Sequence, residues 1–331
     1  MTSQNSDPKL QDTLADELER DGIVALPDML QPAMLARLQE SFERVLQQPA
    51  FNTWTGYEQN EKWRLLVENA LTVDPAVVRL ALDPLLKGIL SRYIGDRYAL
   101  TEARGWKTIR TKADFHGWHN DAWCDETAMP GGERPREVKL AMYLTDVESG
   151  HFSYIAGSHR PAGPARHWSP AEVAPMLPRR RDMLGKAGTA FLFDTTGIHR
   201  QTTPVLTPRN VLFLNFHDPA VRIQPLDISY GRYRPLLLNA AFLPEMDADD
   251  RRILGFGNMN GEAAAQCIVG RSDVRRYPYL HGAVRLALSA RLEAQEIQRQ
   301  AKRIGGFVGR RLGRLRARTG RPAATDAATA H

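Results

Sequence analysis

The chain has 331 residues, of which 43% are hydrophobic and 25% charged, a composition typical of globular proteins with a sizeable core. Two cysteines, Cys124 and Cys267, are too few for a disulfide framework and suit a reducing compartment. No run of about 18 apolar residues and no signal-peptide pattern is present, so we expect a cytoplasmic protein.

The net charge of +6 is concentrated at the C-terminus. Residues 301–331 contain eight basic residues and one acidic residue, a charge of +7. The preceding 300 residues contain 36 basic and 37 acidic residues. A nearly neutral body therefore precedes a basic tail.

The N-terminal part of the chain predicts helices around one short strand. In order, we expect a disordered start (1–8), a helix (10–19), a buried strand (23–26), a helix from Pro32 to about 46 and a helical region (76–94). Residues 51–63 are rich in aromatic side chains. They predict either a loop over a site or a packing layer.

From about residue 98 the pattern changes to short strands separated by turns, which predicts a barrel or jelly roll. The candidate strands are 98–111, 137–144, 151–156, 188–194 and 209–217. After them, 219–280 has no regular pattern and 280–304 predicts a long helix. We therefore expect a single domain over 9–300, with a jelly-roll core at about 98–218.

A His-x-Asp pair, His119 and Asp121, is the strongest chemical signal. Side chains two residues apart in an extended segment point to the same face, so this pair brings an imidazole and a carboxylate together. A third ligand is needed, and His199 is the best candidate. Two histidines and one carboxylate on one side of an ion form the ligand set of non-heme Fe(II) oxygenases.

Further motifs accompany these ligands in a characteristic order. They are Arg209 ten residues after His199, the opening 21–27, the segment 143–146 (Tyr-Leu-Thr-Asp) and the segment 156–160, which contains Gly-Ser-His. With these motifs, the chain resembles the phytanoyl-CoA dioxygenase family of Fe(II)/2-oxoglutarate oxygenases from about residue 15 to 218. The resemblance implies a mainly-β fold with flanking helices, namely a double-stranded β-helix (jelly-roll, cupin-like) core packed by N-terminal and C-terminal helices.

The resemblance also implies the cofactors Fe(II), 2-oxoglutarate and O₂, with Arg209 binding the far carboxylate of 2-oxoglutarate. A second contact to that carboxylate is open, because the family often has a small hydroxyl where this chain has Gln201. Lys107 and Thr108 are further cosubstrate candidates, since the pattern does not decide which face of their strand points inward. The same question of inward or outward orientation applies to Lys139.

The resemblance further implies hydroxylation of an unactivated C–H bond in a small-molecule or lipid/glycan-type substrate, with release of succinate and CO₂. Because Asp121 is present, halogenation is disfavoured, while desaturation and ring chemistry stay open. The alternative is a cupin-like metal protein that does not use 2-oxoglutarate, either an isomerase or a non-catalytic binding protein.

The tail at 301–331 keeps an apolar stripe opposite its arginines, interrupted by glycines. It predicts either a solvated extension or peripheral contact with the anionic inner face of a membrane. No specific nucleic-acid partner is expected.

Overall fold

The computed structural model describes residues 7–47, 63–68, 70–121, 124, 135–160, 163–221 and 246–254, with a few residues of 290–301. Its elements follow one another as α1 (Pro8–Asp21), β1 (Ile23–Leu26), α2 (Pro32–Leu46), β2 (Arg64–Glu68), η3 (Ala70–Thr72), α3 (Pro75–Ala81), α4 (Pro84–Ile94), β3 (Ala99–Thr108), β4 (Glu137–Tyr143), β5 (Val147–Ile155), α5 (Pro170–Val173), η5 (Ala174–Arg179), β6 (Arg180–Gly185), β7 (Ala190–Asp194), β8 (His199–Gln201), β9 (Arg209–His217) and α7 (Ala248–Ile253). None of the described helices is both long and apolar enough to cross a membrane.

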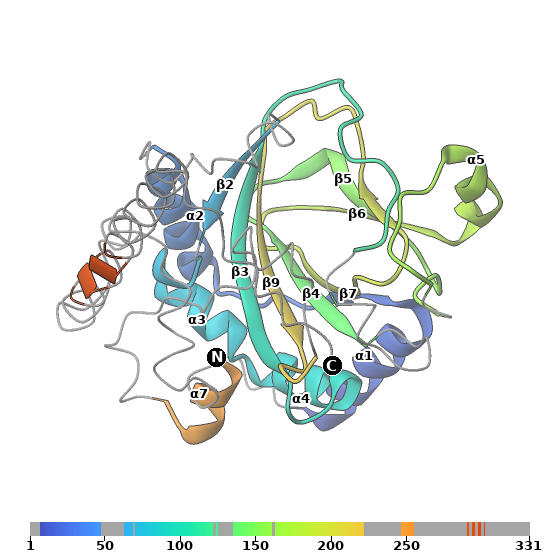
Figure 1. Cartoon of the computed structure of the whole chain (residues 1–331). Helices are drawn as coiled ribbons and strands as arrows, with labels where there is room; N and C mark the ends of the chain where they lie inside the picture. Colours follow the sequence, from blue (N-terminus) through green and yellow to red (C-terminus); the bar gives the residue numbers. More distant parts are fainter. Residues whose placement is uncertain are drawn as a thin grey trace, which may run out of the picture.

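Two antiparallel sheets form the core of the part of the chain that the structure describes. The larger has the strand order β1-β7-β4-β9-β3-β2, and the smaller has the order β6-β5-β8. Figure 1 shows the large sheet in the middle of the molecule, with β5 and β6 to one side and helices α1 to α4 around its other side and lower end. The predicted jelly-roll core with flanking helices is confirmed.

The large sheet has one face toward the helices and one toward the small sheet. On β4, Leu140 and Met142 belong to the apolar cluster that contains the helices. Ala141 and Tyr143, on the alternate face, pack with Phe191 and with residues of β5. Because side chains alternate along a strand, register alone decides which residues face the jelly-roll interior.

The region predicted as helical at 76–94 is two helices, α3 and α4. Pro84 begins α4, and the Asp83 carboxylate caps it by accepting from the Leu85 N–H at 2.9 Å. A proline inside a helix loses a hydrogen bond and clashes with the preceding turn, whereas at the first turn it does neither. The chain therefore ends α3 at Ala81 and starts again.

Three strands and two α-helices among the described residues were not predicted, nor were the short 3-10 helices η3 and η5. Strands β2, β6 and β8 and helices α5 and α7 lie where the sequence shows no clear apolar alternation, and β5 begins earlier than expected, at Val147. Strand β6 is largely exposed and rich in arginine, and β8 has only three residues. The predictions for 51–62, for 301–331 and for most of 219–304 fall outside the described residues, although those described within 290–301 are helical.

Candidate metal centre and cosubstrate site

Main-chain hydrogen bonds bring the two ligand segments together. The His119 N–H donates to the His199 carbonyl at 3.0 Å, and the His199 N–H donates back to the His119 carbonyl at 2.8 Å. Two residues further on, the Asp121 N–H donates to the Thr195 carbonyl at 3.0 Å. The loop before β4 is thereby held against the start of β8, and its alternation points both ligand side chains the same way.

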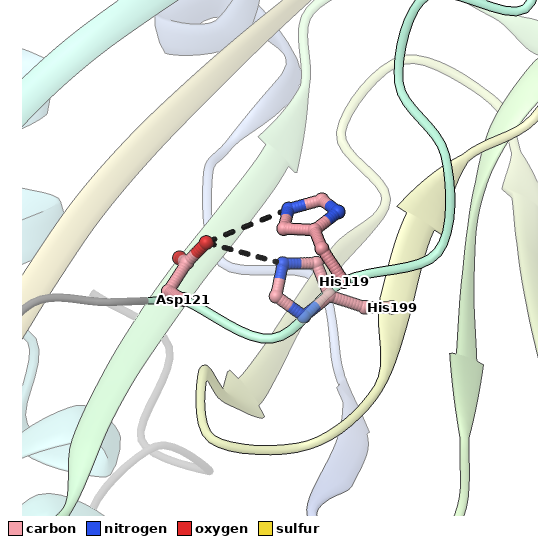
Figure 2. Close-up of side chains that lie close together, drawn as sticks. All are labelled: His119, Asp121 and His199. Carbon is pink, nitrogen blue, oxygen red and sulfur yellow. Dashed lines mark ion pairs between the residues drawn. The ribbon is translucent and has the colours of Figure 1, made fainter. Parts of the chain in front are cut away.

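The three predicted ligands converge on one point. Their ligand atoms all lie within 4.8 Å of one another. Oδ1 of Asp121 is 3.5 Å from Nε2 of His119 and 3.7 Å from Nε2 of His199. Figure 2 shows both imidazole rings turned toward this single carboxylate oxygen. The arrangement fits one metal ion with all three protein ligands on one side.

Each imidazole is held in the tautomer that a metal needs. Nδ1 of His119 lies 2.8 Å from the Gly117 carbonyl, and Nδ1 of His199 lies 2.9 Å from the Gly197 carbonyl. A carbonyl oxygen only accepts, so each Nδ1 carries the proton and donates it. In the neutral ring this tautomer leaves the lone pair on Nε2, which is the form that binds a metal.

The protonation states suit a cation as well. Burial, with the neighbouring charge of His119, lowers the pKa of His199 to about 3. Burial acts to raise the pKa of Asp121, but Lys139 and the two histidines hold it well below its ordinary value. At neutral pH the centre therefore offers a neutral His199 imidazole and an ionised carboxylate, so no proton has to leave these two before metal binds.

The loop before His199 is positioned by two segments from the resemblance motifs. The Ser158 hydroxyl accepts from the Ile198 N–H at 2.7 Å. The Gly157 N–H donates to the Asp21 carbonyl at 2.8 Å, so the Gly-Ser-His segment also contacts the end of α1. The Gly-Ser-His segment, held by the end of α1, thus fixes the backbone of the loop that carries His199.

Gly197 is required by a close approach in the same loop. A Cβ at this position would lie 1.9 Å from the Tyr154 hydroxyl oxygen. That hydroxyl donates to the Asp194 carbonyl at 2.9 Å and so holds the turn between β7 and β8. A side chain at 197 would displace this contact and with it the ligand two residues later.

Three cosubstrate candidates face the jelly-roll interior together. Thr108 on β3 lies directly opposite Arg209 on β9, and its hydroxyl is 3.4 Å from the Gln201 side-chain oxygen. All three side chains are buried, and Arg209 is only 4% exposed. Nε and Nη1 of Arg209 and the amide nitrogen of Gln201 have no hydrogen-bond partner among the described residues.

Burial lowers the pKa of Arg209 to about 10, which leaves the guanidinium charged at neutral pH. A buried cation with two unmatched donors is costly unless an anion or an acceptor meets it. Its planar fork matches a carboxylate. The side chain of Gln201 lies on the same face of β8 as His199, so its free amide donor points toward the same interior.

The structure does not bring Lys107 to this group. Lys107 points to the helix side of β3, where its ammonium donates to both oxygens of Glu43 on α2 at 2.9 Å. Asn210, opposite Lys107 on β9, donates to the same carboxylate at 2.6 Å. Lys107 and Thr108 are neighbours in sequence and therefore lie on opposite faces of the sheet, which corrects the candidate set.

Lys139 faces inward with Ala141 and Tyr143, which settles the orientation that the sequence leaves open. Its ammonium donates to Oδ2 of Asp121. His116 packs edge-on against the ring of His119, with centroids 4.3 Å apart, and its Nδ1 accepts a long hydrogen bond of 3.4 Å from the Gln201 N–H. His116 therefore packs beside a metal ligand and is not itself one of the three ligands.

Asn120 is a structural residue of the centre that sequence reasoning missed. Its side-chain oxygen accepts from the Arg166 N–H at 3.0 Å and from the Trp168 indole N–H at 3.1 Å. Its amide donates to the Pro164 carbonyl at 3.2 Å. This residue ties the segment between the two ligands to the loop before α5, and no local motif signals such a contact.

The donor atoms of the centre are those of a known group of metalloenzymes. Two imidazoles and one carboxylate, with their Nε2 atoms and an ionised oxygen aimed at one point inside a jelly roll, are the donor set of non-heme Fe(II) oxygenases. Comparison with known proteins agrees with this class. The phytanoyl-CoA dioxygenase (PhyH) family profile matches residues 18–208, more than half of the chain, so the chain belongs to that family.

The individual relatives share about a quarter of their residues with this chain, or fewer. The ectoine dioxygenase of Sphingopyxis alaskensis is 26% identical over 238 residues, which cover 62% of this chain and 75% of the relative. The crystal structure of EctD from S. alaskensis with 2-oxoglutarate and 5-hydroxyectoine superposes with a TM-score of 0.50 at 25% identity, covering 63% of this chain and 77% of that one. The epimerase SnoN, with Fe3+, alpha ketoglutarate and nogalamycin RO, has a TM-score of 0.50 at 19% identity, covering 68% and 90%, and shares the fold.

The chain is an Fe(II)- and 2-oxoglutarate-dependent dioxygenase. The predicted family, enzyme class and cofactors are confirmed by these matches together with the His-Asp-His centre. The alternative of a cupin-like protein that does not use 2-oxoglutarate is not supported.

Proposed function

We propose that His119, Asp121 and His199 hold Fe(II), and that Arg209, helped by Gln201 and Thr108, binds the far carboxylate of 2-oxoglutarate. The observation that carries this proposal is the buried guanidinium of Arg209, with two donor nitrogens unmatched among the described residues. Facial coordination by three protein ligands leaves three positions of a six-coordinate ion for the cosubstrate and O₂.

With iron, 2-oxoglutarate and O₂ bound, the site would supply an oxidation in which one atom of O₂ enters succinate as 2-oxoglutarate loses CO₂, and the other atom hydroxylates a substrate C–H bond. The residues of this chain supply position and charge. Arg209 and Gln201 fix one end of the cosubstrate, and the two imidazoles and Asp121 fix the metal. The apolar wall around Tyr143, Phe152 and Phe193 limits water at the inner side of the centre.

We propose that the substrate is a small, polar molecule. The interior face of β9 next to Lys139 is polar. Asn215 lies opposite both Lys139 and Glu102 on the neighbouring strands and is fully buried. Its amide donates to the Glu102 carboxylate at 2.6 Å. The side-chain oxygen of Asn215 has no partner among the described residues. Such a wall suits a hydrogen-bonding substrate better than a hydrocarbon chain. The similarity to ectoine dioxygenases supports the same choice and makes ectoine the first compound to test.

The test is a substrate panel read by succinate release from the Fe(II)-loaded enzyme. Ectoine, other small zwitterions, sugars and lipid-linked glycans are compared at equal 2-oxoglutarate concentration. The proposal expects a small polar compound to raise succinate release and to appear as a product heavier by one oxygen. Stimulation by lipidic compounds alone would contradict the substrate class and leave the cosubstrate roles intact.

We further propose, from sequence alone, that the basic segment 301–331 makes peripheral contact with anionic membranes. Eight basic residues against one acidic residue support the proposal, since each basic residue near an acidic bilayer contributes about 1 kcal/mol. The solvated tail remains the alternative, and a vesicle experiment separates the two.

A further inference from the structure

The two carboxylate oxygens of Asp121 have different environments. Oδ1 faces the imidazoles, at 3.5 Å and 3.7 Å from their Nε2 atoms. Oδ2 accepts from the ammonium of Lys139. One oxygen therefore faces the metal position and the other is held by a cation.

Lys139 is well placed to hold that oxygen. It lies on β4, which is bonded to β7 on one side and β9 on the other, so its backbone is fixed from both sides. Its side chain is 17% exposed, and the fully buried Glu137 carboxylate lies 3.9 Å from the same ammonium. A second carboxylate behind Lys139 favours the charged ammonium in this partly desolvated place.

We propose that Lys139 is a positioning residue that makes Asp121 bind the metal through Oδ1 alone. A carboxylate that chelates with both oxygens fills two positions of a six-coordinate ion. With the two imidazoles, this leaves two open positions instead of three, and 2-oxoglutarate with O₂ requires three. By holding Oδ2, Lys139 keeps the third position open. The proposal rests on the metal assignment of the proposed function.

The positive charge of Lys139 suits this role better than a neutral donor would. A neutral donor could occupy Oδ2, but it would compete poorly with a divalent cation for a carboxylate oxygen. An ammonium forms a charge-assisted hydrogen bond, which is roughly twice as strong as a neutral one. It also compensates Asp121 in the metal-free protein, so an otherwise unpaired carboxylate is not left beside the two imidazoles.

The experiment compares Lys139→Met, Lys139→Gln and Lys139→Arg with the wild type. Lys107→Met is the matched control, because it also removes a strand lysine paired with a carboxylate, but on the helix face of the sheet. Crystal structures of the Ni(II)-loaded proteins give the number of Asp121 oxygens on the metal. Thermal melting with and without Ni(II), and succinate release with Fe(II), complete the readouts.

In the wild type, Lys139→Arg and Lys107→Met, Asp121 should bind Ni(II) through one oxygen. In Lys139→Met and Lys139→Gln it should bind through two. Succinate release should fall by about 10- to 100-fold in these two variants, the usual range for residues that orient a metal ligand, with the KM for 2-oxoglutarate little changed. Ni(II) should also raise their melting temperature more than it does that of the wild type, since the metal replaces the lost cation.

The Gln variant keeps the test decisive if the Met variant does not fold. One-oxygen binding in both neutral variants, or succinate release within twofold of the wild type, would overturn the role of Lys139. If the wild type itself binds no metal at His119, Asp121 and His199 or releases no succinate, the proposed function fails instead.

Discussion

Thr108 lies directly opposite Arg209 across strands β3 and β9, and both side chains face the jelly-roll interior. The next pair along the same strands, Lys107 and Asn210, faces the helices and shares the carboxylate of Glu43. One step along the strand thus separates the proposed cosubstrate site from a structural ion pair. This register is what removes Lys107 from the candidate pocket and keeps Thr108 in it.

The first prediction concerns this division. Gln201→Leu removes the unmatched amide donor and should raise the KM for 2-oxoglutarate by about tenfold, the worth of one hydrogen bond to a charged group. Lys107→Met should leave that KM unchanged and lower the melting temperature instead. Steady-state succinate kinetics and thermal melting of both variants measure the contrast. If Lys107→Met raised the KM for 2-oxoglutarate more than Gln201→Leu does, the cosubstrate would lie on the helix side of β3.

The second prediction concerns the metal. His119→Ala, Asp121→Ala and His199→Ala should each abolish succinate release and Fe(II) binding, because each removes one of three ligands. The fold should persist, since none of these side chains belongs to the apolar clusters of the core. Circular dichroism and metal analysis accompany the assay. A His199→Ala protein with near-normal activity would disprove the ligand assignment.

The fold class could be predicted because its signals are local. Short apolar strands separated by turns indicated the jelly roll, and the His-x-Asp spacing placed two ligands on one face. His199 was the best candidate for the third ligand, and the role of Arg209 came from the resemblance to the phytanoyl-CoA dioxygenase family.

Which side chains face the interior, and where the short strands form, depends on pairing between strands that are distant in the sequence. Whether Lys107 or Thr108 faces inward, and whether Lys139 does, is decided by register with β9 and by the helices packed on the other face. Strand β8 is three residues long and is stabilised by its pairing with β5, so no apolar pattern reveals it. The contacts of Asn120 come from a loop more than forty residues away along the chain. The domain limits at 9–300 stay a prediction.

The third prediction concerns acid stability and the Glu43 pair. Burial alone acts to raise the pKa of Glu43, but hydrogen bonds from Asn210 and Lys107 bring it below its ordinary value. A carboxylate with a depressed folded-state pKa stabilises the fold above its unfolded pKa of about 4.3, and this contribution is lost as pH falls through the folded-state pKa.

Glu43→Gln should therefore be less stable than the wild type at neutral pH, and the difference in free energy of unfolding should shrink as the pH falls below about 4. Chemical denaturation at several pH values measures it. Glu148→Gln serves as the control, because the Glu148 side chain is 86% exposed and should show little difference at any pH. A Glu43→Gln difference that does not vary with pH would mean that the pair contributes through packing alone.

The fourth prediction concerns the basic C-terminal segment. A chain ending at Arg299 should keep its succinate release, because the charge of the tail is not needed to balance the nearly neutral body. The full chain should sediment with acidic-lipid vesicles, and less so at high salt, since salt screens the attraction. Neutral vesicles are the control. Equal sedimentation of both chains with acidic vesicles would identify the segment as a solvated extension.

We propose that a metal at His119, Asp121 and His199 and the guanidinium of Arg209 together bind 2-oxoglutarate. Titration of 2-oxoglutarate into the Fe(II) protein under anaerobic conditions, followed by calorimetry, measures this binding. We predict one site that needs the metal, is lost in His199→Ala, and is weakened in Arg209→Ala by about 2–5 kcal/mol, or about 30- to 5,000-fold. Arg209→Lys should recover only part of this affinity, because an ammonium lacks the planar fork. Binding that is equally strong without Fe(II), or unchanged in Arg209→Ala, would show that the metal and Arg209 do not hold 2-oxoglutarate together.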